Sequence, residues 1–190
     1  MKNLLLAIIM VFAACGISLG TASASPASSS TVLPVIETAD TTGKNIYFAA
    51  PLFSQAEKYY NLKLATLLES YGYKVFLPQR DGFEAAVLEN KTEEELTRMI
   101  FDKDVSEILK ADIIFMVLDG RIPDEGACVE LGIAYANQKK CYGIKTDTRS
   151  AELKLDLNPM IAGCFVKIFK NFDGDKLIEE LKQYLTEKGL

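Results

Sequence analysis

Acidic side chains that follow a short apolar run are the residues in this sequence best suited to chemistry. Residues 113–118 (IIFMVL) have the composition of a buried strand, and Asp124 and Glu130 lie in the loop and helical pattern behind it. Residues one helical turn from Glu130 are mostly small, such as Gly126, which leaves room for a ligand beside the carboxylate. From spacing alone, however, a helical carboxylate is more often solvated than catalytic, so both interpretations stay open.

One missing residue type limits the chemistry, because none of the 190 residues is a histidine. This excludes Ser-His and Cys-His nucleophile pairs and every histidine metal site. Acid–base chemistry must therefore use carboxylates, tyrosine, lysine or cysteine. The cysteine spacings are typical of neither a zinc site nor a disulfide framework, and we expect Cys128, Cys141 and Cys164 to be buried thiols.

The charge of the chain argues against nucleic acid as a partner. The formal net charge is −5, and no basic stripe is present. The length fits one domain of ordinary size, with enough apolar residues for a core.

The N-terminus has the anatomy of an export signal over residues 1–24. Its apolar core is too short to span a bilayer comfortably as a permanent helix. Residues 11–15 (VFAAC) are similar to a bacterial lipobox, in which a lipidated Cys15 would anchor the protein in the membrane. Residues 22–24 (ASA) offer an ordinary signal-peptidase site instead. We favour a cell-envelope lipoprotein over a secreted or periplasmic protein, and either alternative implies export.

A tether and one folded domain follow the signal. Residues 25–43 are rich in Ser, Thr, Ala and Pro and are expected to be flexible, so the folded domain should span residues 44–190.

Short β-favouring runs alternate with helical patterns along this domain. Strands are predicted at 45–50, 73–77, 113–118, 141–146 and 165–169, and helices at 54–71, 83–88, 92–110, 175–188 and after Asp124. This alternation predicts an α/β fold with a parallel five-stranded sheet covered by helices on both faces, doubly wound like flavodoxin. The ligands of such sheets bind at the carboxyl ends of the strands.

Two local expectations accompany this fold. On the helix after Asp124, the apolar stripe expected to pack on the sheet is Val129, Gly132, Ile133 and Ala136. The segments 79–82 and 147–163 are expected to be irregular. No G-x-G-x-x-G or Walker sequence follows the first strand, so dinucleotide and P-loop sites are not predicted.

Five short motifs in fixed order narrow the interpretation. They are residues 46–53 (IYFAAPLF), Asp104 eight residues before Asp112, residues 119–126 (DGRIPDEG), residues 130–132 (ELG) and residues 158–160 (NPM). Together they resemble the nucleoside 2-deoxyribosyltransferase family, from Lys44 to the last predicted strand. The resemblance implies a flavodoxin-like homo-oligomer that needs no metal or cofactor. Its substrates would be 2′-deoxynucleosides and free nucleobases, and the sugar would pass through a covalent enzyme intermediate.

The resemblance also assigns catalytic roles. Glu130 would be the nucleophile that attacks the anomeric carbon, and Tyr47 would hydrogen-bond and orient it. Asp104 and Asp124 would form an acidic pair near the base, in which one protonates the leaving base. Glycosidic cleavage through an oxocarbenium-like state needs such a division between an ionised and a protonated carboxyl group.

Further residues would contact the substrate. Asn158 and Met160 resemble residues that reach into the site of a neighbouring subunit and hold the sugar hydroxyls. Gln79 matches a base-contacting position loosely, and Gly126 leaves space beside the nucleophile. Asp119 either touches substrate or simply ends its strand.

Two departures from the family keep alternatives open. Ala50 stands where many relatives have glycine, which could alter base preference. The export signal is unusual because characterised relatives are cytosolic salvage enzymes. An exported 2′-deoxynucleoside hydrolase with the same nucleophile, or a non-catalytic nucleoside-binding lipoprotein, therefore remain as alternatives.

Overall fold

The computed structural model describes residues 43–149 and 155–190 of the chain. The predicted export signal and all but the last residue of the predicted tether lie outside the described residues. Among the described residues, no helix is long and apolar enough to cross a membrane.

The described residues build one parallel sheet. Its strands are β1 (Asn45–Ala49), β2 (Lys74–Phe76), β3 (Ile113–Val117), β4 (Lys140–Lys145) and β5 (Lys167–Lys170). They lie in the order β2-β1-β3-β4-β5, with every pair parallel. This is the strand order of flavodoxin, so the predicted fold class is confirmed. The order reverses between β1 and β3, where such folds open a crevice for ligands.

Helices connect the strands, with bounds close to the predicted ones. They are α1 (Gln55–Ser70), α2 (Pro78–Asp81), α3 (Ala85–Leu88), α4 (Glu93–Lys110), α5 (Glu125–Ala136), α6 (Pro159–Ala162) and α7 (Gly174–Glu187). Two single-turn helices, α2 and α6, form where irregular chain was expected. Both begin with proline, whose fixed φ suits the first helical turn.

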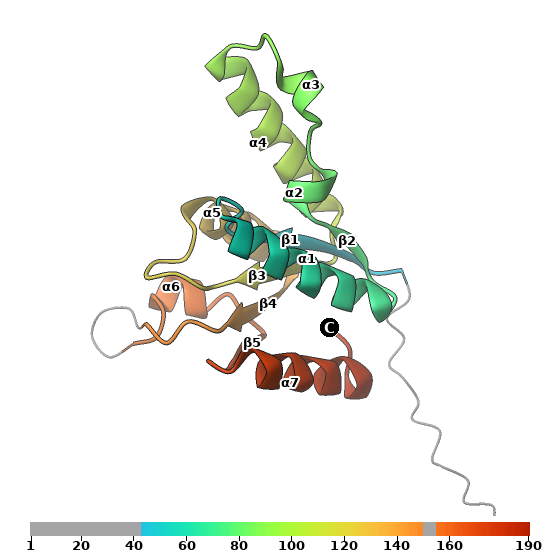
Figure 1. Cartoon of the computed structure of the whole chain (residues 1–190), viewed down its shortest axis with the longest axis vertical. Helices are drawn as coiled ribbons and strands as arrows, with labels where there is room; N and C mark the ends of the chain where they lie inside the picture. The colour runs from blue at the N-terminus through green and yellow to red at the C-terminus, as the bar shows by residue number, and fades with distance from the viewer. Residues whose placement is uncertain (1–42, 150–154) are drawn as a thin grey trace, which may run out of the picture. The chain divides into compact units, whose positions relative to one another are not determined.

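The helices cover both faces of the sheet (Figure 1). Helices α1 and α7 pack on one face, over a core that includes the stacked rings of Phe48 and Phe115. Helices α4 and α5 pack on the other face, against Tyr47, Ile114 and Met116. Figure 1 also shows α4 running away from the sheet toward α3. The alternation along β1 therefore sends Tyr47 toward α4 and α5, and Phe48 toward α1 and α7.

The side of α5 that faces the sheet differs from the expected stripe. Ala127, Leu131 and Ala134 are buried against the sheet, whereas Val129 is 57% exposed and Gly132 lies in open space. Of the expected stripe only Ile133 packs against the core, so the prediction was wrong for Val129, Gly132 and Ala136. Both stripes are apolar, so helical periodicity could not choose between them, and the two alanines let α5 approach the sheet closely.

The cysteines also depart in part from expectation. Cys141 is buried, but Cys128 and Cys164 are only half-buried, although both pack against the core.

The glycine at the centre of β4 sets how closely its neighbours pack. A β-carbon on Gly143 would lie 2.8 Å from Leu118 Cδ1 and 3.1 Å from Phe165 Cε1. We therefore expect Gly143→Ala to lower the free energy of unfolding by about 1–2 kcal/mol.

Thermal melts measure this effect, with Gly132→Ala as the control. A β-carbon on Gly132 meets nothing within 4 Å, so that variant should be neutral or stabilised by up to about 1 kcal/mol. Equal melting temperatures for the two variants would contradict the packing described here.

Candidate active site

The centre of the candidate site is a hydrogen bond between β1 and α5. The Tyr47 hydroxyl donates to Glu130 Oε1 at 2.6 Å. Tyr47 is fully buried and Glu130 is partly buried. Two residues 83 positions apart in sequence meet here because β1 and β3 are neighbours in the sheet and the chain after β3 returns over β1 as α5. A length of 2.6 Å is typical of a hydroxyl that donates to an ionised oxygen.

Two further carboxyl groups shift the pKa values of Tyr47 and Glu130. Asp104 comes from α4 and interacts with the Tyr47 phenol, and Asp124 is the N-cap of α5. The charges of both residues raise the pKa of Glu130. Asp124 is fixed because its Oδ1 accepts a hydrogen bond from Ala127 N at 2.8 Å. The structure thus brings together all four residues that the sequence assigned to catalysis.

The electrostatics of the pair follow from its burial. The net pKa of Glu130 is about 7. Burial is the largest cause of this rise, the charges of Asp104 and Asp124 add to it, and the hydrogen bond from Tyr47 opposes it. Burial and the charge of Glu130 also raise the pKa of Tyr47 far above its ordinary value. Tyr47 therefore remains protonated at physiological pH and acts as a donor to Glu130, not as a base.

Asp104 has an environment that favours its protonated form. Burial raises its pKa above that of an ordinary aspartate, and Glu107 adds to this, while Tyr47 and Lys103 oppose it. A carboxyl group that holds its proton more readily than usual suits a general acid.

Two residues beside the site were not singled out from the sequence. The ring of Phe76 stacks on the ring of Tyr47, with centroids 5.6 Å apart and planes at 23°. Lys103 Nζ lies 5.2 Å from the centroid of the Phe76 ring. The available signal was weak: Phe76 lies in the predicted strand 73–77, but the register that pairs it with Tyr47 appears only in the structure.

Two predicted substrate residues are bonded elsewhere in this structure. The Gln79 side chain accepts from Asn61 Nδ2 at 3.0 Å and donates to Lys58 O at 2.8 Å, so it links the chain after β2 to α1. The Asp119 carboxylate accepts from the backbone N and the hydroxyl of Thr146, which joins the loops after β3 and β4. This geometry favours the interpretation in which Asp119 ends its strand. A substrate contact for either residue stays a prediction.

The remaining predicted residues lie at the surface. Asn158 caps α6 by accepting from Met160 N at 2.9 Å, and Met160 is 82% exposed. A β-carbon on Gly126 would lie 3.2 Å from Asp124 Oδ1, so the glycine leaves space for that carboxylate. Within the described residues, none of these three contacts Glu130 through a recorded hydrogen bond.

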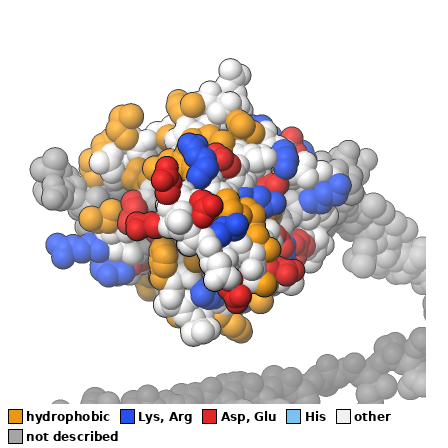
Figure 2. All heavy atoms as spheres, turned by 90° about the horizontal axis from the view of Figure 1, so that it is seen from above, with side chains coloured by type: hydrophobic (Ala, Val, Ile, Leu, Met, Phe, Trp, Pro, Cys, Tyr) orange, Lys and Arg blue, Asp and Glu red, His pale blue; other side chains and the backbone are white. Residues whose placement is uncertain are grey.

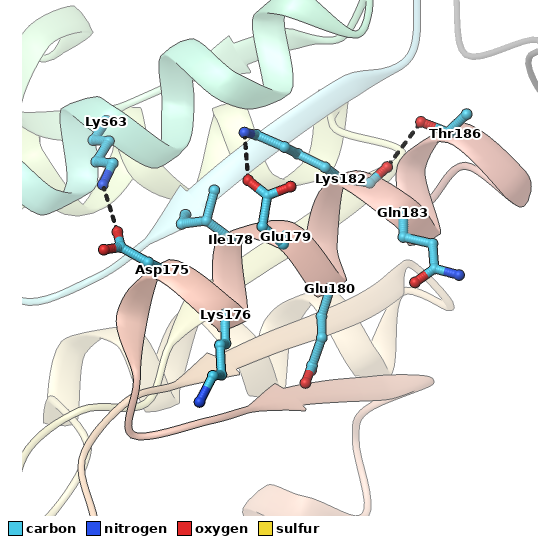
Figure 3. A pocket seen from close by; sticks show the side chains of 9 residues that line it. All are labelled: Lys63, Asp175, Lys176, Ile178, Glu179, Glu180, Lys182, Gln183 and Thr186. Carbon is cyan, nitrogen blue, oxygen red and sulfur yellow. Dashed lines mark hydrogen bonds and ion pairs between the residues drawn. The ribbon is translucent and has the colours of Figure 1, made fainter. Parts of the chain in front are cut away.

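A hollow of about 850 Å³ lies along α7 and holds none of the residues of this site. Most of the side chains that line it are charged, and some pair with one another, such as Lys63 with Asp175 and Lys182 with Glu179 (Figure 3). In the described part of the chain, no group of three or more Cys, Asp or Glu residues is placed to hold a metal ion.

The raised pKa of Glu130 predicts a cost in stability. Ionisation opposes folding here, so the wild type should lose stability as pH rises from 4.5, the ordinary value, through about 7. Glu130→Gln cannot ionise, and its amide oxygen can still accept from Tyr47. We expect the variant to be more stable than the wild type at pH 8 by about 2 kcal/mol, allowing for partial exposure.

Denaturant titrations at pH 5 and pH 8 measure the difference, which should shrink at the lower pH. A Glu130→Gln variant less stable than the wild type at pH 8 would show that the buried carboxylate stabilises the fold.

Several solved structures are similar to this chain in fold. A conserved protein from Enterococcus faecalis V583 is 26% identical, with a TM-score of 0.61, over 75% of this chain and 99% of that chain. The 2-deoxyribosyltransferase from Bacillus psychrosaccharolyticus is 25% identical, with a TM-score of 0.56, over 70% of this chain and 90% of its own. A 2-desoxiribosyltransferase from Leishmania mexicana shares the fold at 24% identity and a TM-score of 0.54, over 77% of this chain and 99% of its own.

Comparison with protein-family models gives the family. The search of curated proteins found no match. The family model described as nucleoside 2-deoxyribosyltransferase matches residues 46–187, which include all four clustered side chains. The chain therefore belongs to the nucleoside 2-deoxyribosyltransferase family.

Proposed function

We propose that this protein transfers a 2-deoxyribosyl group between nucleobases by double displacement, through a covalent sugar ester of Glu130. The observation that carries the proposal is the 2.6 Å hydrogen bond from Tyr47 to Glu130 Oε1. It holds the carboxylate in one orientation and leaves Oε2 as the attacking atom. Orientation of this kind lowers the barrier because the nucleophile need not be ordered during the reaction.

The first step forms the intermediate. Glu130 Oε2 attacks C1′ of the sugar, and the C1′–N bond breaks with its electron pair going to the base nitrogen. Asp104, which holds its proton more readily than an ordinary aspartate, donates that proton to the leaving base. The product is a neutral glycosyl ester and an ionised Asp104.

The second step reverses these changes with a new base. The nitrogen of the incoming base attacks C1′, and the ester C1′–O bond breaks and returns its electron pair to Glu130. Asp104 takes the proton that the incoming base loses. Two displacements restore the original configuration at C1′. Water in place of the second base would make the same protein a 2′-deoxynucleoside hydrolase.

The charge that develops on the substrate supports this division of roles. The pKa of Glu130, about 7, is reached in the empty site, where Asp104 and Asp124 add negative charge beside it. The oxocarbenium-like state places positive charge at C1′, which favours an ionised Glu130 at the moment of reaction. A 2′-hydroxyl would withdraw electrons from that centre, so we expect 2′-deoxyribose to be the preferred sugar.

A product analysis tests the activity. The protein is incubated with deoxyinosine, with and without adenine, and the products are separated by chromatography. We expect deoxyadenosine to form with adenine, inosine to react far more slowly, and Glu130→Ala to lose roughly a thousandfold or more in kcat/KM.

Val166→Ala, a change at an exposed position just before β5, is the control and should keep near-wild-type activity. Formation of hypoxanthine and free deoxyribose regardless of adenine would indicate the hydrolase. No turnover of any deoxynucleoside would leave only a binding role.

We also propose that the site is completed by a neighbouring subunit. Met160 is exposed at the start of α6, and large apolar side chains are exposed on α4 and α5, including Phe101, Val129 and Tyr135. Figure 2 shows hydrophobic side chains exposed between charged ones on one face. Symmetric assembly would cover such residues, and in the family the residues that match Asn158 and Met160 reach the neighbour's sugar site.

A mixing experiment tests the shared site. Inactive Glu130→Ala and Asn158→Ala proteins are combined under conditions that exchange subunits. Part of the activity should return, because some interfaces then pair an intact Glu130 with an intact Asn158. Demonstrated exchange without recovery, or a monomeric active enzyme, would contradict the proposal.

Export remains a proposal based on residues 1–24, with the folded domain beginning near Lys44. Cys15→Ser should move a lipid-anchored protein into the soluble periplasmic or extracellular fraction, as cell fractionation would measure. A full-length native chain in the cytoplasm would contradict export altogether.

A further inference from the structure

The Tyr47 ring is held on one side by another aromatic ring. Tyr47 in β1 and Phe76 in β2 are direct partners across the parallel strands, so both side chains lie on the same face of the sheet. Their rings stack with centroids 5.6 Å apart and planes at 23°. Paired aromatic rings attract one another beyond the effect of simple burial, and this preference fixes their relative orientation.

Phe76 is itself held by a cation from α4. Lys103 Nζ lies 5.2 Å from the centroid of the Phe76 ring, within the range of a cation–π contact. Lys103 is anchored in turn by Glu107, one helical turn further on, at 3.1 Å. Phe76 therefore contacts both the Tyr47 ring and a lysine that is paired with Glu107.

This arrangement bears directly on the nucleophile. The Tyr47 hydroxyl reaches Glu130 only while the ring keeps its present tilt, because the phenol is rigid and its oxygen lies at the far end. Phe76 is half-buried at the edge of the sheet, so it is replaceable without opening the centre of the core. Phe76 forms no hydrogen bond with Glu130, so within the described structure its influence is indirect. One route passes through Tyr47, and a second passes through Lys103, whose charge acts on Asp104.

We propose that Phe76 is a positioning residue, which holds the Tyr47 phenol on Glu130 and thereby sets how readily Glu130 ionises. The consequence for catalysis rests on the proposed function, but the consequence for the ionisation of Glu130 does not. The proposal can therefore be tested in the free protein.

Groups on three elements, β1, α4 and α5, shift the pKa of Glu130. The hydrogen bond from Tyr47 on β1 lowers its pKa, and the charges of Asp104 on α4 and Asp124 on α5 raise it. Removal of Phe76 leaves both aspartates in place. If the phenol then drifts from Glu130, the lowering contribution weakens and the pKa of Glu130 must rise.

The experiment is a carbon-13 NMR titration of the Glu130 carboxyl group, whose signal is assigned by its absence in Glu130→Gln. Phe76→Leu, or Phe76→Met should the first not fold, is expected to raise the titration midpoint by roughly one pH unit. Phe76→Tyr keeps the ring and should restore the wild-type midpoint. Val75→Ala, in the same strand but on the opposite face of the sheet, controls for a general weakening of β2.

The decisive comparison repeats the titration in a Tyr47→Phe background, where the hydroxyl is absent. There Phe76→Leu should cause no further shift, because the proposal assigns its effect to that hydroxyl; an effect carried by Lys103 and Asp104 would persist. An unchanged midpoint in Phe76→Leu, or the same shift in both backgrounds, would overturn the proposal.

Activity assays on the same variants keep the two proposals apart. In an active enzyme, Phe76→Leu should lower kcat about tenfold and move the acidic limb of the kcat/KM profile to higher pH, with little change in KM. A shifted midpoint in a protein without turnover would support the positioning role and reject the proposed function.

Discussion

The structure of this protein is organised around one partly buried carboxylate, that of Glu130, and the phenol that hydrogen-bonds to it, that of Tyr47. The Glu130 side chain is partly buried, and the Tyr47 hydroxyl satisfies one of its oxygens at 2.6 Å. Burial alone raises the pKa of such a group, and the phenol partly offsets that cost. The result is a carboxylate that ionises near neutral pH in a fixed orientation, which is what a nucleophile at a sugar carbon requires.

The rest of the fold serves to bring these groups together. Tyr47 lies in β1, beside the point where the strand order reverses, and Glu130 lies in the helix that follows β3. The small residues Ala127 and Ala134 let α5 approach the sheet, while α4 adds Asp104 from the same side. The doubly wound fold brings β1, α4 and α5 together on one face of the sheet, although they are far apart in sequence.

Much of this was predictable from the sequence, and the failures have physical causes. The alternation of apolar runs with helical patterns predicted the sheet, and the motifs placed Tyr47 and Glu130 in one site. The buried face of α5 was missed because two apolar stripes compete on that helix. The positioning role proposed for Phe76 could not be predicted, because it depends on the strand register and on the contact with Lys103 from α4. The structural contacts of Gln79 could not be predicted, because nothing in the sequence shows that the Asn61 side chain donates a hydrogen bond to the Gln79 amide oxygen.

The central claim, that Glu130 itself carries the sugar, can be tested by trapping the intermediate. The protein is mixed with excess deoxyinosine without an acceptor base, quenched with acid within the first turnover, digested and mapped by mass spectrometry. The account predicts one deoxyribosyl group on the peptide that contains Glu130, and none in Glu130→Gln. A deoxyribosyl group on another residue, or turnover that inverts the configuration at C1′ without any adduct, would contradict it.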